Sequence, residues 1–367
     1  MNGAPWGGSE ELWYRTAMHL ATSGAKVGCA VYHWPEKEIR LQLLEEAGCT
    51  VYRLPNKKTA GGRFLVKSYR KQQAKEHLKK RIAQLPIAEY DLVVVNQGGL
   101  EIITTPWKDL YRQLPRYVLL FHNYNEADEF SATQKANLQA WISGAEKNLF
   151  AAAKAKEVLQ KQINVTIKQA AVFINPISFP APTSPAAFPS LKKEGHVLSV
   201  FAALDVQRKG QDKLVRLLAL PKWKERAWQL HLYGEGKDHA LLQKMIREAG
   251  LEQKVFLKGH TSDVAAAMRE THIILQATNV DAMPLSVMEA MAIGRPLIVT
   301  VVGDMPLWVR EGINGWVCSS EEYAIDNCLE KAWQNRHEWE QMGRLSFEIF
   351  QEKFPKNVEA SFLNQLP

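Results

Sequence analysis

Residues 281–296 read Asp-Ala-Met-Pro-Leu-Ser-Val-Met-Glu-Ala-Met-Ala-Ile-Gly-Arg-Pro and predict a short helix with defined ends. Pro284 is expected at the first helical position and Gly294 just beyond the last turn. The N-terminus of such a helix offers unpaired amides and a partial positive charge, and phosphate is their usual ligand. From Pro284 to Glu289 a helix rises about 7.5 Å, at roughly 1.5 Å per residue. Asp281 and Glu289 therefore suit two hydroxyl-bearing ends of one ligand with a diphosphate between them, which describes a nucleotide sugar.

Apolar runs of strand length alternate with segments of helix length along the whole chain, which is typical of parallel α/β folds. In the first half, strands are expected at residues 26–32, 50–53, 91–96, 117–121 and 171–174. In the second half, they are expected at residues 196–201, 229–233, 255–258, 273–276 and 296–300. The pattern predicts two doubly wound, Rossmann-like domains whose ligands bind beyond the carboxyl ends of the strands.

A proline-rich segment separates the two series of strands. Residues 175–189 contain five prolines, a density that forbids a regular helix or central strand and makes a semi-rigid connection. The predicted division is an N-terminal domain over residues 1–177, a linker over 178–192, a C-terminal domain over 193–345, and a C-terminal helix over 346–367 that packs back on the first domain.

The composition suggests a large enzyme without a membrane span. The chain has 367 residues, of which 46% are apolar, enough for a core in each of two domains. It contains no apolar run of about 18 residues, and its first residues do not show the charged and then apolar pattern of a signal sequence. The cysteines at 29, 49, 318 and 328 form no CxxC or Cys/His cluster. We therefore expect reduced thiols in a cytoplasmic protein, and no metal site or other cofactor.

Basic residues gather in one stretch. Residues 57–81 contain ten lysines and arginines, and Glu76 is their only acid. A solvated helix face is the simpler interpretation, and contact with an anionic acceptor or with the inner face of an anionic membrane is the alternative. Aromatic residues are not interleaved through the stretch, so nucleic acid is not an expected partner.

The segment 281–296 resembles the acid-x7-Glu signature of retaining glycosyltransferases of the GT-B fold, specifically glycosyltransferase family four (glycosyl transferases group 1). In that family the first acid and the amides after it meet the donor sugar, and the second acid binds the nucleotide ribose. The resemblance assigns donor contacts to Asp281, Met283, Pro284, Leu285 and Glu289. Asp281 replaces the usual Glu and Ala282 the usual Gly, and Pro284 has no N–H to donate. The alternative is an ordinary βα unit with Glu289 on a solvated face.

A second phosphate-binding loop is expected at Arg208-Lys209-Gly210. The family has Arg-x5-Lys-Gly here, and the two cations meet the donor diphosphate. Lys209 and Gly210 match, but the Arg position holds Ala203, and Arg208 is the neighbouring source of the missing charge. This departure bears on catalysis, because positioned cations or amides must stabilise the leaving group. The alternative for Lys209 is a solvated loop lysine.

Glycine-rich turns supply the remaining donor contacts that the resemblance implies. A glycine lets the backbone approach a ligand closely, and a following helix adds its free amides. These contacts fall on Gly7, Gly8, Gly234, Gly236, Gly259 and His260. For Gly7 and Gly8, a surface turn before a capped helix is the alternative. Asn314-Gly315 is expected to be no more than a turn.

Two loops of the first domain are further candidates. His122 follows the strand at 117–121, and the family often places a His or polar cluster near the sugar, so His122 is a catalytic candidate beside Lys209 and Asp281. The competing interpretation is a structural histidine at a strand end. Gln97-Gly98-Gly99 is a weaker candidate on the acceptor side.

The start of the chain departs from the family. There, an apolar strand precedes the glycine-rich loop, whereas here only Met-Asn-Gly-Ala-Pro does, which is too short and too rich in Gly and Pro. We expect the first sheet to lack its leading strand, through truncation, and to leave an apolar slot beside the strand at 26–32.

The resemblance implies two Rossmann-like domains facing across a cleft, with the acceptor on the first and the nucleotide sugar on the second. The expected activity is metal-independent transfer of a hexosyl group, with retention, from a UDP- or GDP-sugar to a carbohydrate, lipid-linked or small-molecule hydroxyl, in polysaccharide or glycolipid biosynthesis. The alternatives are a degenerate, non-catalytic nucleotide-sugar-binding protein and a GT-B-like nucleotide-sugar epimerase.

Overall fold

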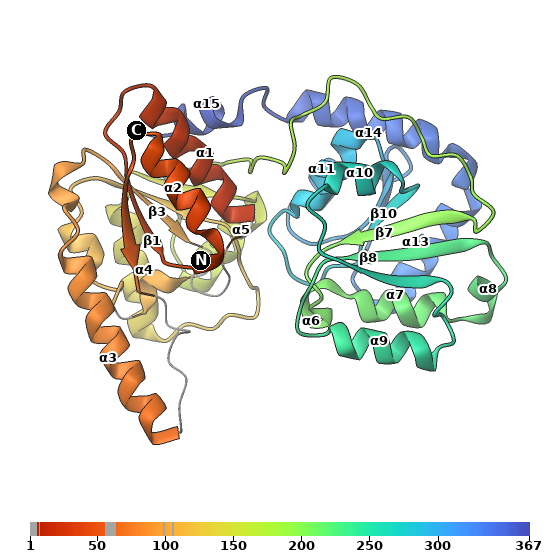
Figure 1. The fold of residues 1–367 in the computed structure, drawn as a ribbon, viewed down its shortest axis with the longest axis horizontal. Coiled ribbons are helices and arrows are strands. Elements are labelled where there is room, and N and C mark those ends of the chain that lie inside the picture. The colour runs from red at the N-terminus through yellow and green to blue at the C-terminus, as the bar shows by residue number, and fades with distance from the viewer. Residues whose placement is uncertain (1–5, 7, 56–63, 98–99, 105) are drawn as a thin grey trace. The chain divides into compact units, whose positions relative to one another are not determined.

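The computed structural model describes the chain except for residues 1–5, 7, 56–63, 98–99 and 105 (Figure 1). The chain divides into two compact units: unit 1 comprises Met1–Pro176 and Asn357–Pro367, and unit 2 comprises Ile177–Lys356. Every strand pairing within the named sheets is parallel, so the predicted parallel α/β class is confirmed.

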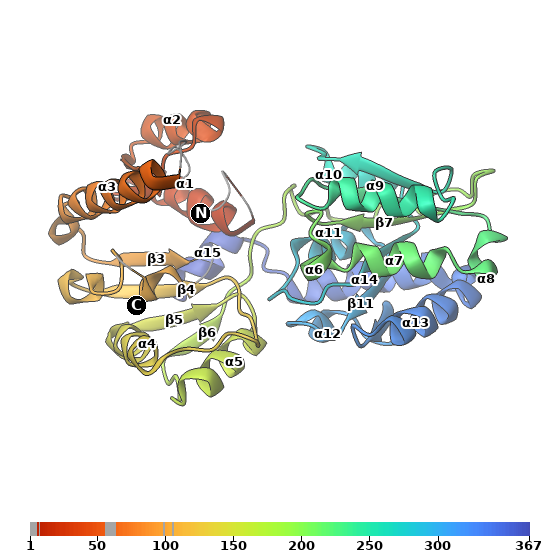
Figure 2. The same ribbon diagram turned by 90° about the horizontal axis from the view of Figure 1, so that it is seen from below.

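Unit 1 contains two parallel sheets, one of order β1-β2 and one of order β3-β4-β5-β6. Figure 2 labels the four strands of the second sheet. The helices and strands of unit 1 are α1 (Gly8–Thr22), β1 (Gly28–Tyr32), α2 (Glu38–Glu46), β2 (Thr50–Leu54), α3 (Phe64–Ala83), β3 (Val93–Gln97), β4 (Tyr117–Phe121), α4 (Ala132–Gly144), β5 (Lys147–Phe150), α5 (Ala153–Ile163), β6 (Ala170–Val172) and α15 (Val358–Leu363). The strand β4 is buried along its whole length, as its run Tyr-Val-Leu-Leu-Phe predicts for a central parallel strand.

Unit 2 is built on one six-stranded sheet of order β12-β11-β10-β7-β8-β9. Its elements are β7 (His196–Phe201), α6 (Val206–Lys209), α7 (Gln211–Leu218), α8 (Pro221–Lys224), β8 (Trp228–Tyr233), α9 (His239–Glu248), β9 (Val255–Gly259), α10 (Val264–Arg269), β10 (Ile273–Gln276), α11 (Leu285–Ile293), β11 (Leu297–Thr300), α12 (Met305–Trp308), β12 (Gly315–Cys318), α13 (Glu322–Gln334) and α14 (Trp339–Lys353). Helices α7 and α9 follow one face of the sheet, and α10, α11 and α14 follow the other (Figure 1).

The strand order of unit 2 reverses between β7 and β10, since the chain proceeds from β7 to β8 and β9 on one side and from β10 to β11 and β12 on the other. This is the order of a doubly wound nucleotide-binding sheet. Loops that leave the carboxyl ends of two strands at such a reversal run apart and leave a crevice. The reversal therefore predicts where a ligand binds in unit 2.

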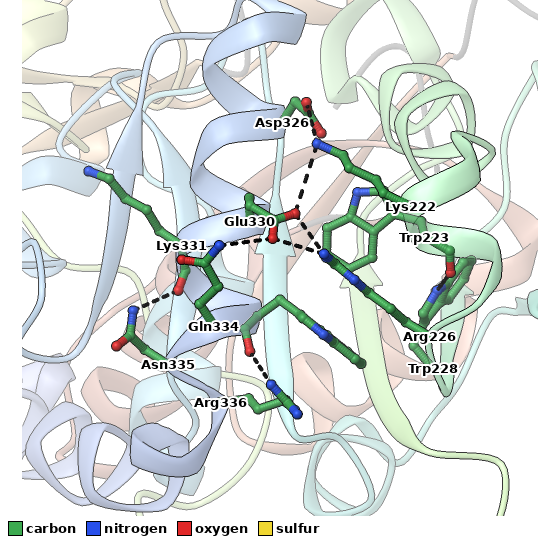
Figure 3. Close-up of polar contacts among 11 residues, drawn as sticks. Lys222, Trp223, Arg226, Trp228, Asp326, Glu330, Lys331, Gln334, Asn335 and Arg336 are labelled. Carbon is green, nitrogen blue, oxygen red and sulfur yellow. Dashed lines mark hydrogen bonds and ion pairs between the residues drawn. The ribbon is translucent and has the colours of Figure 1, made fainter.

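A cluster of aromatic and charged side chains fastens α13 to α8 and β8 (Figure 3). The guanidinium of Arg226 lies 4.4 Å from the ring centroid of Trp223 and donates to both carboxylate oxygens of Glu330, at 2.8 and 2.9 Å. Trp228 donates its indole N–H to the carbonyl of Trp223 at 2.7 Å. Beside this cluster, Lys222 pairs with Asp326 at 2.7 Å. The bonds from Arg226 lower the pKa of Glu330, so the carboxylate stays charged.

The proline-rich segment predicted as a linker over 178–192 is part of unit 2. Arg295, which is fully buried, donates to the carbonyls of Ala186 and Ala187 at 3.4 and 2.8 Å. It also donates to the carbonyls of Met268, Arg269, Ile293 and Gly294. The prolines leave the carbonyls of this extended segment without ladder partners, and the buried guanidinium supplies donors for two of them.

The C-terminal region also differs from the predicted division. The helix expected over 346–367 is two helices, because α14 ends at Lys353 in unit 2 and α15 begins at Val358 in unit 1. Within unit 1, α15 packs on α1, and Phe362 lies 6.2 Å from Phe173, measured between ring centroids. The break falls at Phe354-Pro355, since a residue before proline is pushed out of the helical region.

Two strands are present that the sequence pattern did not predict, β5 (Lys147–Phe150) and β12 (Gly315–Cys318). The second overturns the expectation that Asn314-Gly315 is only a turn, because Gly315 pairs with Leu297 of β11. A Cβ on Gly315 would lie 2.2 Å from the carbonyl oxygen of Leu297, so glycine is required there by close packing. Pro284 is also placed differently: it is the N-cap residue, with ψ of 129°, and α11 begins at Leu285.

Candidate functional site

The candidate site of unit 2 lies beyond the carboxyl ends of β7 and β10, where the strand order reverses. The ammonium of Lys209, at the end of α6, forms an ion pair with the carboxylate of Asp281, in the loop after β10. Each of these side chains is 13% exposed, so both are largely withdrawn from solvent while keeping an accessible edge. The two predicted residues therefore meet at one place, and Lys209 is not a solvated loop lysine.

The Lys-Gly pair has a structural reason. Asp205 caps α6 by accepting the N–H of Arg208 at 3.3 Å, and Gly210 ends the helix with a positive φ of 65°. A Cβ on Gly210 would lie 2.2 Å from the carbonyl oxygen of Ala277, so a glycine is needed for the two loops to touch. The close approach sets Lys209 beside the loop that carries Asp281.

Hydrogen bonds of Asn279, which the sequence did not predict, hold the same two loops together. Asn279 donates its backbone N–H to the carbonyl of Arg208 and its side-chain amide to the carbonyl of Gln207, both at 2.8 Å. Lys213 of α7 donates to the Asn279 amide oxygen at 2.6 Å. Asn279 is thus fixed at both ends, two residues before Asp281. No motif marked it, because the contact depends on residues 66 positions apart in the chain.

The other side of the Asp281 loop is held by the turn after β11. Asp304 donates its backbone N–H to the carbonyl of Ala282 at 2.9 Å. Gly303 has a φ of 58°, and a Cβ there would lie 1.8 Å from the same carbonyl oxygen. The loop is therefore held by its neighbours on both sides, which supports a fixed position for Asp281 before any ligand arrives.

The helix α11 is buried over most of its length, and Glu289 within it is only 5% exposed. The interpretation of Glu289 as a solvated surface acid is therefore wrong. Its carboxylate accepts the backbone N–H of Ser178 at 3.0 Å. Burial raises the pKa of Glu289, and the hydrogen bonds from Ser178 oppose that shift. A buried carboxylate with a fixed partner is suited to orient a hydroxyl group.

Of the remaining donor residues, Met283 and Pro284 are buried before α11 and Leu285 is partly exposed, whereas Gly259 and His260 lie at the end of the edge strand β9. Gly234 and Gly236 follow β8, and a Cβ on either would lie within 2.3 Å of a carbonyl in the loop after β7. The N–H of Gly234 donates to the carbonyl of Gly259 at 2.8 Å. These glycines have packing roles in supporting the loop after β7. The exposed residues of the set are His260 and Arg208, together with Ala203 at the position of the missing arginine.

In unit 1, His122 lies directly after β4 and is 5% exposed. Its Nε2 lies 2.5 Å from the amide oxygen of Asn96, which requires the N–H on that nitrogen. Among the described residues, Nδ1 has no hydrogen-bond partner. Burial lowers the pKa of His122 to about 3, so the ring is neutral near pH 7. It offers an acceptor nitrogen to a ligand hydroxyl and carries no positive charge for a diphosphate.

The other unit 1 candidates are only partly described. Gly8 is the first residue of α1, and Gly7 lies outside the described residues. Gln97 ends β3, is 3% exposed, and has no partner for its amide among the described residues. Gly98 and Gly99 also lie outside the described part of the chain.

No group of three or more His, Cys, Asp or Glu side chains among the described residues is placed to hold a metal ion. Among the same residues, no helix combines the length and apolar character needed to cross a membrane. The four cysteines are free thiols.

A lysine and an acid thus converge at the reversal of a doubly wound sheet, ahead of a buried helix. Residues 184–345 match the family described as glycosyl transferases group 1. The finer assignment to glycosyltransferase family four stays a prediction.

Known relatives match part of the chain. The poly(ribitol-phosphate) alpha-N-acetylglucosaminyltransferase of Staphylococcus aureus is 28% identical over 41% of this chain and 29% of its own length. The poly(glycerol-phosphate) alpha-glucosyltransferase of Bacillus subtilis is 28% identical over 43% of this chain and 23% of its own. The aligned regions thus span less than a third of these two proteins.

The fold of the whole chain resembles that of HepE from Anabaena, in a crystal structure with UDP. The TM-score is 0.73 at 17% identity, covering 99% of this chain and 98% of HepE. At this identity the likeness shows the fold alone, and that fold is GT-B.

Proposed function

We propose that this protein is a retaining glycosyltransferase that moves a hexosyl group from a nucleoside diphosphate sugar to a hydroxyl acceptor. The observation that carries the proposal is the pairing of Lys209 with Asp281 at the β7/β10 reversal, just before α11 begins. A cation and an acid at this point match the two chemical needs of such a donor. The diphosphate needs positive charge, and the sugar needs an acceptor for its hydroxyl groups.

In the proposed reaction, Lys209 and the amides at the start of α11 hold the diphosphate. Asp281 accepts a sugar hydroxyl, and Glu289 accepts a ribose hydroxyl. The bond from the anomeric carbon to the diphosphate breaks as the acceptor oxygen bonds on the same face. The acceptor proton passes to the departing diphosphate. The protein contributes position and charge, and no protein carboxylate bonds to the sugar.

We also propose that the reaction needs no bound metal, because Lys209 and backbone amides supply the positive charge. This part of the proposal has its own test. Turnover in the presence of EDTA should equal turnover in the presence of added Mg²⁺ or Mn²⁺. A loss of turnover on chelation that a divalent ion restores would contradict it.

UDP-sugars are the first donors to test, because HepE has been solved with UDP-glucose. The acceptor class proposed is a carbohydrate, lipid-linked or small-molecule hydroxyl, and the two curated relatives act on polymers of ribitol phosphate and glycerol phosphate, as their names state. Cytoplasmic location at the inner face of a membrane is a separate proposal. Sedimentation with vesicles of anionic and of neutral lipid tests that contact.

Incubation with radiolabelled UDP-, GDP- and ADP-sugars, each with and without candidate acceptors, tests the function against its alternatives. A glycosyltransferase gives a labelled conjugate with acceptor, or slow donor hydrolysis without it. An epimerase gives the epimeric donor with no acceptor present. A non-catalytic protein binds a donor in calorimetry and releases it unchanged, and that outcome would overturn the proposal.

A further inference from the structure

The four cysteines of the chain lie as two pairs, one in each unit. In unit 2, Cys318 ends β12 and Cys328 lies in α13, and the turn of residues 319–321 joins these two elements. In unit 1, Cys29 lies in β1 and Cys49 directly precedes β2. In both pairs the two thiols share a hydrogen bond. Two thiols in contact have a reaction that a single thiol lacks, since oxidation can join them.

The pair in unit 2 meets where α13 packs on β12. Alternate residues of a strand face the same side, so Trp316 and Cys318 point the same way. Trp316 belongs to the buried cluster that includes Cys328 and Leu329 of α13, and Cys318 packs against that cluster. The sulfur of Cys318 also lies 3.8 Å from the carbonyl oxygen of Val299 in β11. The two thiols therefore lie between the edge strand of the sheet and the helix beside it.

The two sulfurs of this pair differ in access and in protonation. Cys318 is partly exposed, whereas Cys328 is 4% exposed. The hydrogen bond from Cys328 lowers the pKa of the Cys318 thiol, and burial and Glu311 oppose that shift. The same bond, together with burial, raises the pKa of Cys328. Glu311 lies 3.6 Å from Lys331, the other charged side chain that acts on the pair. Cys318 is thus the thiol that reacts first, and Cys328 is the protonated thiol beside it.

The pair in unit 1 lacks these properties. Cys29 is 7% exposed and Cys49 is 5% exposed. Both pack under α1, where the sulfur of Cys49 lies 3.8 Å from the carbonyl oxygen of Ala17. Burial raises the pKa of both thiols, that of Cys29 to about 12. Because protonated and shielded thiols react slowly, this pair is an internal control for the pair in unit 2.

The turn between Cys318 and Cys328 is connected to the candidate site of unit 2. Lys213 of α7 donates to the carbonyl of Ser320 at 2.5 Å and to the side-chain oxygen of Asn279 at 2.6 Å. Asn279 lies two residues before Asp281 and fixes the loop that carries it. A displacement of Ser320 therefore changes the hold of Lys213 on Asn279.

We propose that Cys318 and Cys328 are a site of reversible oxidation by hydroperoxides, and that their disulfide loosens the loop that carries Asp281 and weakens donor binding. The Cys318 thiolate attacks one oxygen of hydrogen peroxide, the O–O bond breaks, and hydroxide leaves as Cys318 becomes a sulfenic acid. Cys328 then attacks this sulfur, its proton passes to the departing hydroxyl, and water leaves as the S–S bond forms. The two thiols lose two electrons in all, and the peroxide becomes two waters. A dithiol reductant reverses the reaction by exchange.

The disulfide acts on the loop through the turn that it spans. Closing the bond draws the second turn of α13 toward the end of β12, and residues 319–321 move with it. The carbonyl of Ser320 then leaves Lys213, which no longer holds Asn279 in place. The effect on donor binding rests on the proposed function, whereas the disulfide and the loosened loop do not.

Peroxide treatment of the reduced protein tests the site of oxidation, with disulfides mapped by mass spectrometry of peptides after the free thiols are alkylated. The 318–328 link should form while Cys29 and Cys49 stay reduced. Cys328→Ser should form no link, and Cys318 should accumulate as a sulfenic acid that dimedone captures. Cys49→Ser, the matched change in unit 1, should leave the 318–328 link unaffected. Absence of this link from the native chain, or equally fast oxidation of both pairs, would overturn the proposal.

Hydrogen exchange at the Asn279 amide measures the loop without any donor. Oxidation should speed this exchange by about 10-fold or more, as local opening does. It should have no such effect in Lys213→Met, where the connection from Ser320 is already cut. Affinity for UDP in calorimetry should fall about 2- to 30-fold on oxidation, the usual size of coupling between connected sites.

The two readouts separate this proposal from the proposed function. An unchanged exchange rate at Asn279 in the disulfide form, or an unchanged affinity in a protein that binds UDP, would overturn the proposal. Faster exchange at Asn279 in a protein that binds no UDP in either state would support the loosened loop and count against the proposed function.

Discussion

Lys209 and Asp281 are 72 residues apart in the chain, and their side chains form an ion pair at the carboxyl edge of the unit 2 sheet. Each side chain is 13% exposed, so the pair is not freely solvated and either charge would be costly if left without a partner. Donor binding in the proposed reaction exchanges partners: the diphosphate takes Lys209 and a sugar hydroxyl takes Asp281. The pair therefore holds both side chains in position until the donor arrives.

This exchange of partners predicts that substitution of Asp281 strongly changes the rate of sugar transfer. Asp281→Ala should abolish transfer, because the sugar loses its acceptor and Lys209 loses the partner that positions it. Asp281→Glu should keep partial activity or alter donor preference, since the carboxylate reaches one methylene further. Initial rates with a UDP-sugar measure both variants.

Unit 2 offers a matched control in Lys222 and Asp326, a lysine–aspartate pair at 2.7 Å on α8 and α13 (Figure 3). Asp326→Ala removes the same kind of pair away from the β7/β10 reversal and should leave turnover unchanged. Transfer at the native rate by Asp281→Ala would show that Asp281 is only a loop acid.

Glu289 should show opposite effects on donor binding and on stability. Glu289→Gln keeps the volume but removes a charge-assisted hydrogen bond to ribose, so donor binding should weaken by about 1.5–3 kcal/mol. The pKa of Glu289 is raised by burial, so its charged form is disfavoured by folding. Its contribution to stability is therefore present below the unfolded pKa and is lost as pH rises through the folded pKa. At neutral pH, Glu289→Gln should melt at the same or a higher temperature.

Calorimetry with UDP and thermal unfolding at pH 7 test these two effects separately. Unchanged donor affinity in a folded Glu289→Gln variant would remove the ribose role. Weaker binding accompanied by a large loss of stability would point instead to a structural role through Ser178, whose N–H the carboxylate accepts.

The sequence predicted the elements whose patterns are strong by themselves. The strand β4, with five apolar residues, occurs as expected, and so does the C-cap Gly294 with its φ of 77°. The strand β5 reads Lys-Asn-Leu-Phe, too short and too polar to be recognised, and pairing with β4 and β6 on its two sides stabilises it. Position within the sheet overrode local propensity there.

The residues of the candidate site likewise include some that the sequence predicts and some that it does not. Lys209, Asp281 and Glu289 could be predicted because each lies within a recognisable local pattern. Asn279 and Lys213 could not, since they meet only when the loop after β10 lies against α7. Contacts between segments that are distant in the sequence follow from the topology of the fold. The residues next to Asn279 and Lys213 in the sequence give no sign that the two will meet.

Two buried histidines allow a prediction of how the stability of the protein changes at acidic pH. Burial lowers the pKa of His122 to about 3 and, as the main cause, that of His272 to about 4. A depressed folded pKa means that the stabilising contribution is present above the unfolded pKa, near 6.5, and is lost as pH falls toward 4 and then 3. Because each ring stays neutral in the folded protein, it should lower the free energy of unfolding by up to about 1.4 kcal/mol for each pH unit that the pH falls within this window.

Denaturant unfolding at pH 7, 6, 5 and 4 measures this loss, with His337→Gln as a control because that histidine is largely exposed. His272→Asn should flatten the dependence between pH 6.5 and 4, since asparagine can accept the Val197 N–H that now goes to His272 Nδ1. The pH profile of transfer should show no ionisation of His122 between pH 5 and 8. An inflection in that range that disappears in His122→Gln would show that His122 is charged during turnover.

Lys209 is predicted to be the principal side-chain cation on the donor diphosphate, because Ala203 stands where the family has arginine. Lys209→Ala should reduce turnover far more than Arg208→Ala, since Lys209 is held at the site by Asp281 whereas Arg208 is exposed. Lys222→Ala, which breaks the control pair with Asp326, should have no effect on turnover.

Ala203 is exposed, so Ala203→Arg can be accommodated without disturbing the core, and it should tighten donor binding if its side chain reaches the diphosphate. Steady-state kinetics and calorimetry with UDP measure these effects. If Arg208→Ala abolishes turnover while Lys209→Ala does not, the roles of the two residues are reversed. If neither variant changes turnover, backbone amides alone hold the phosphate and the non-catalytic alternative gains support.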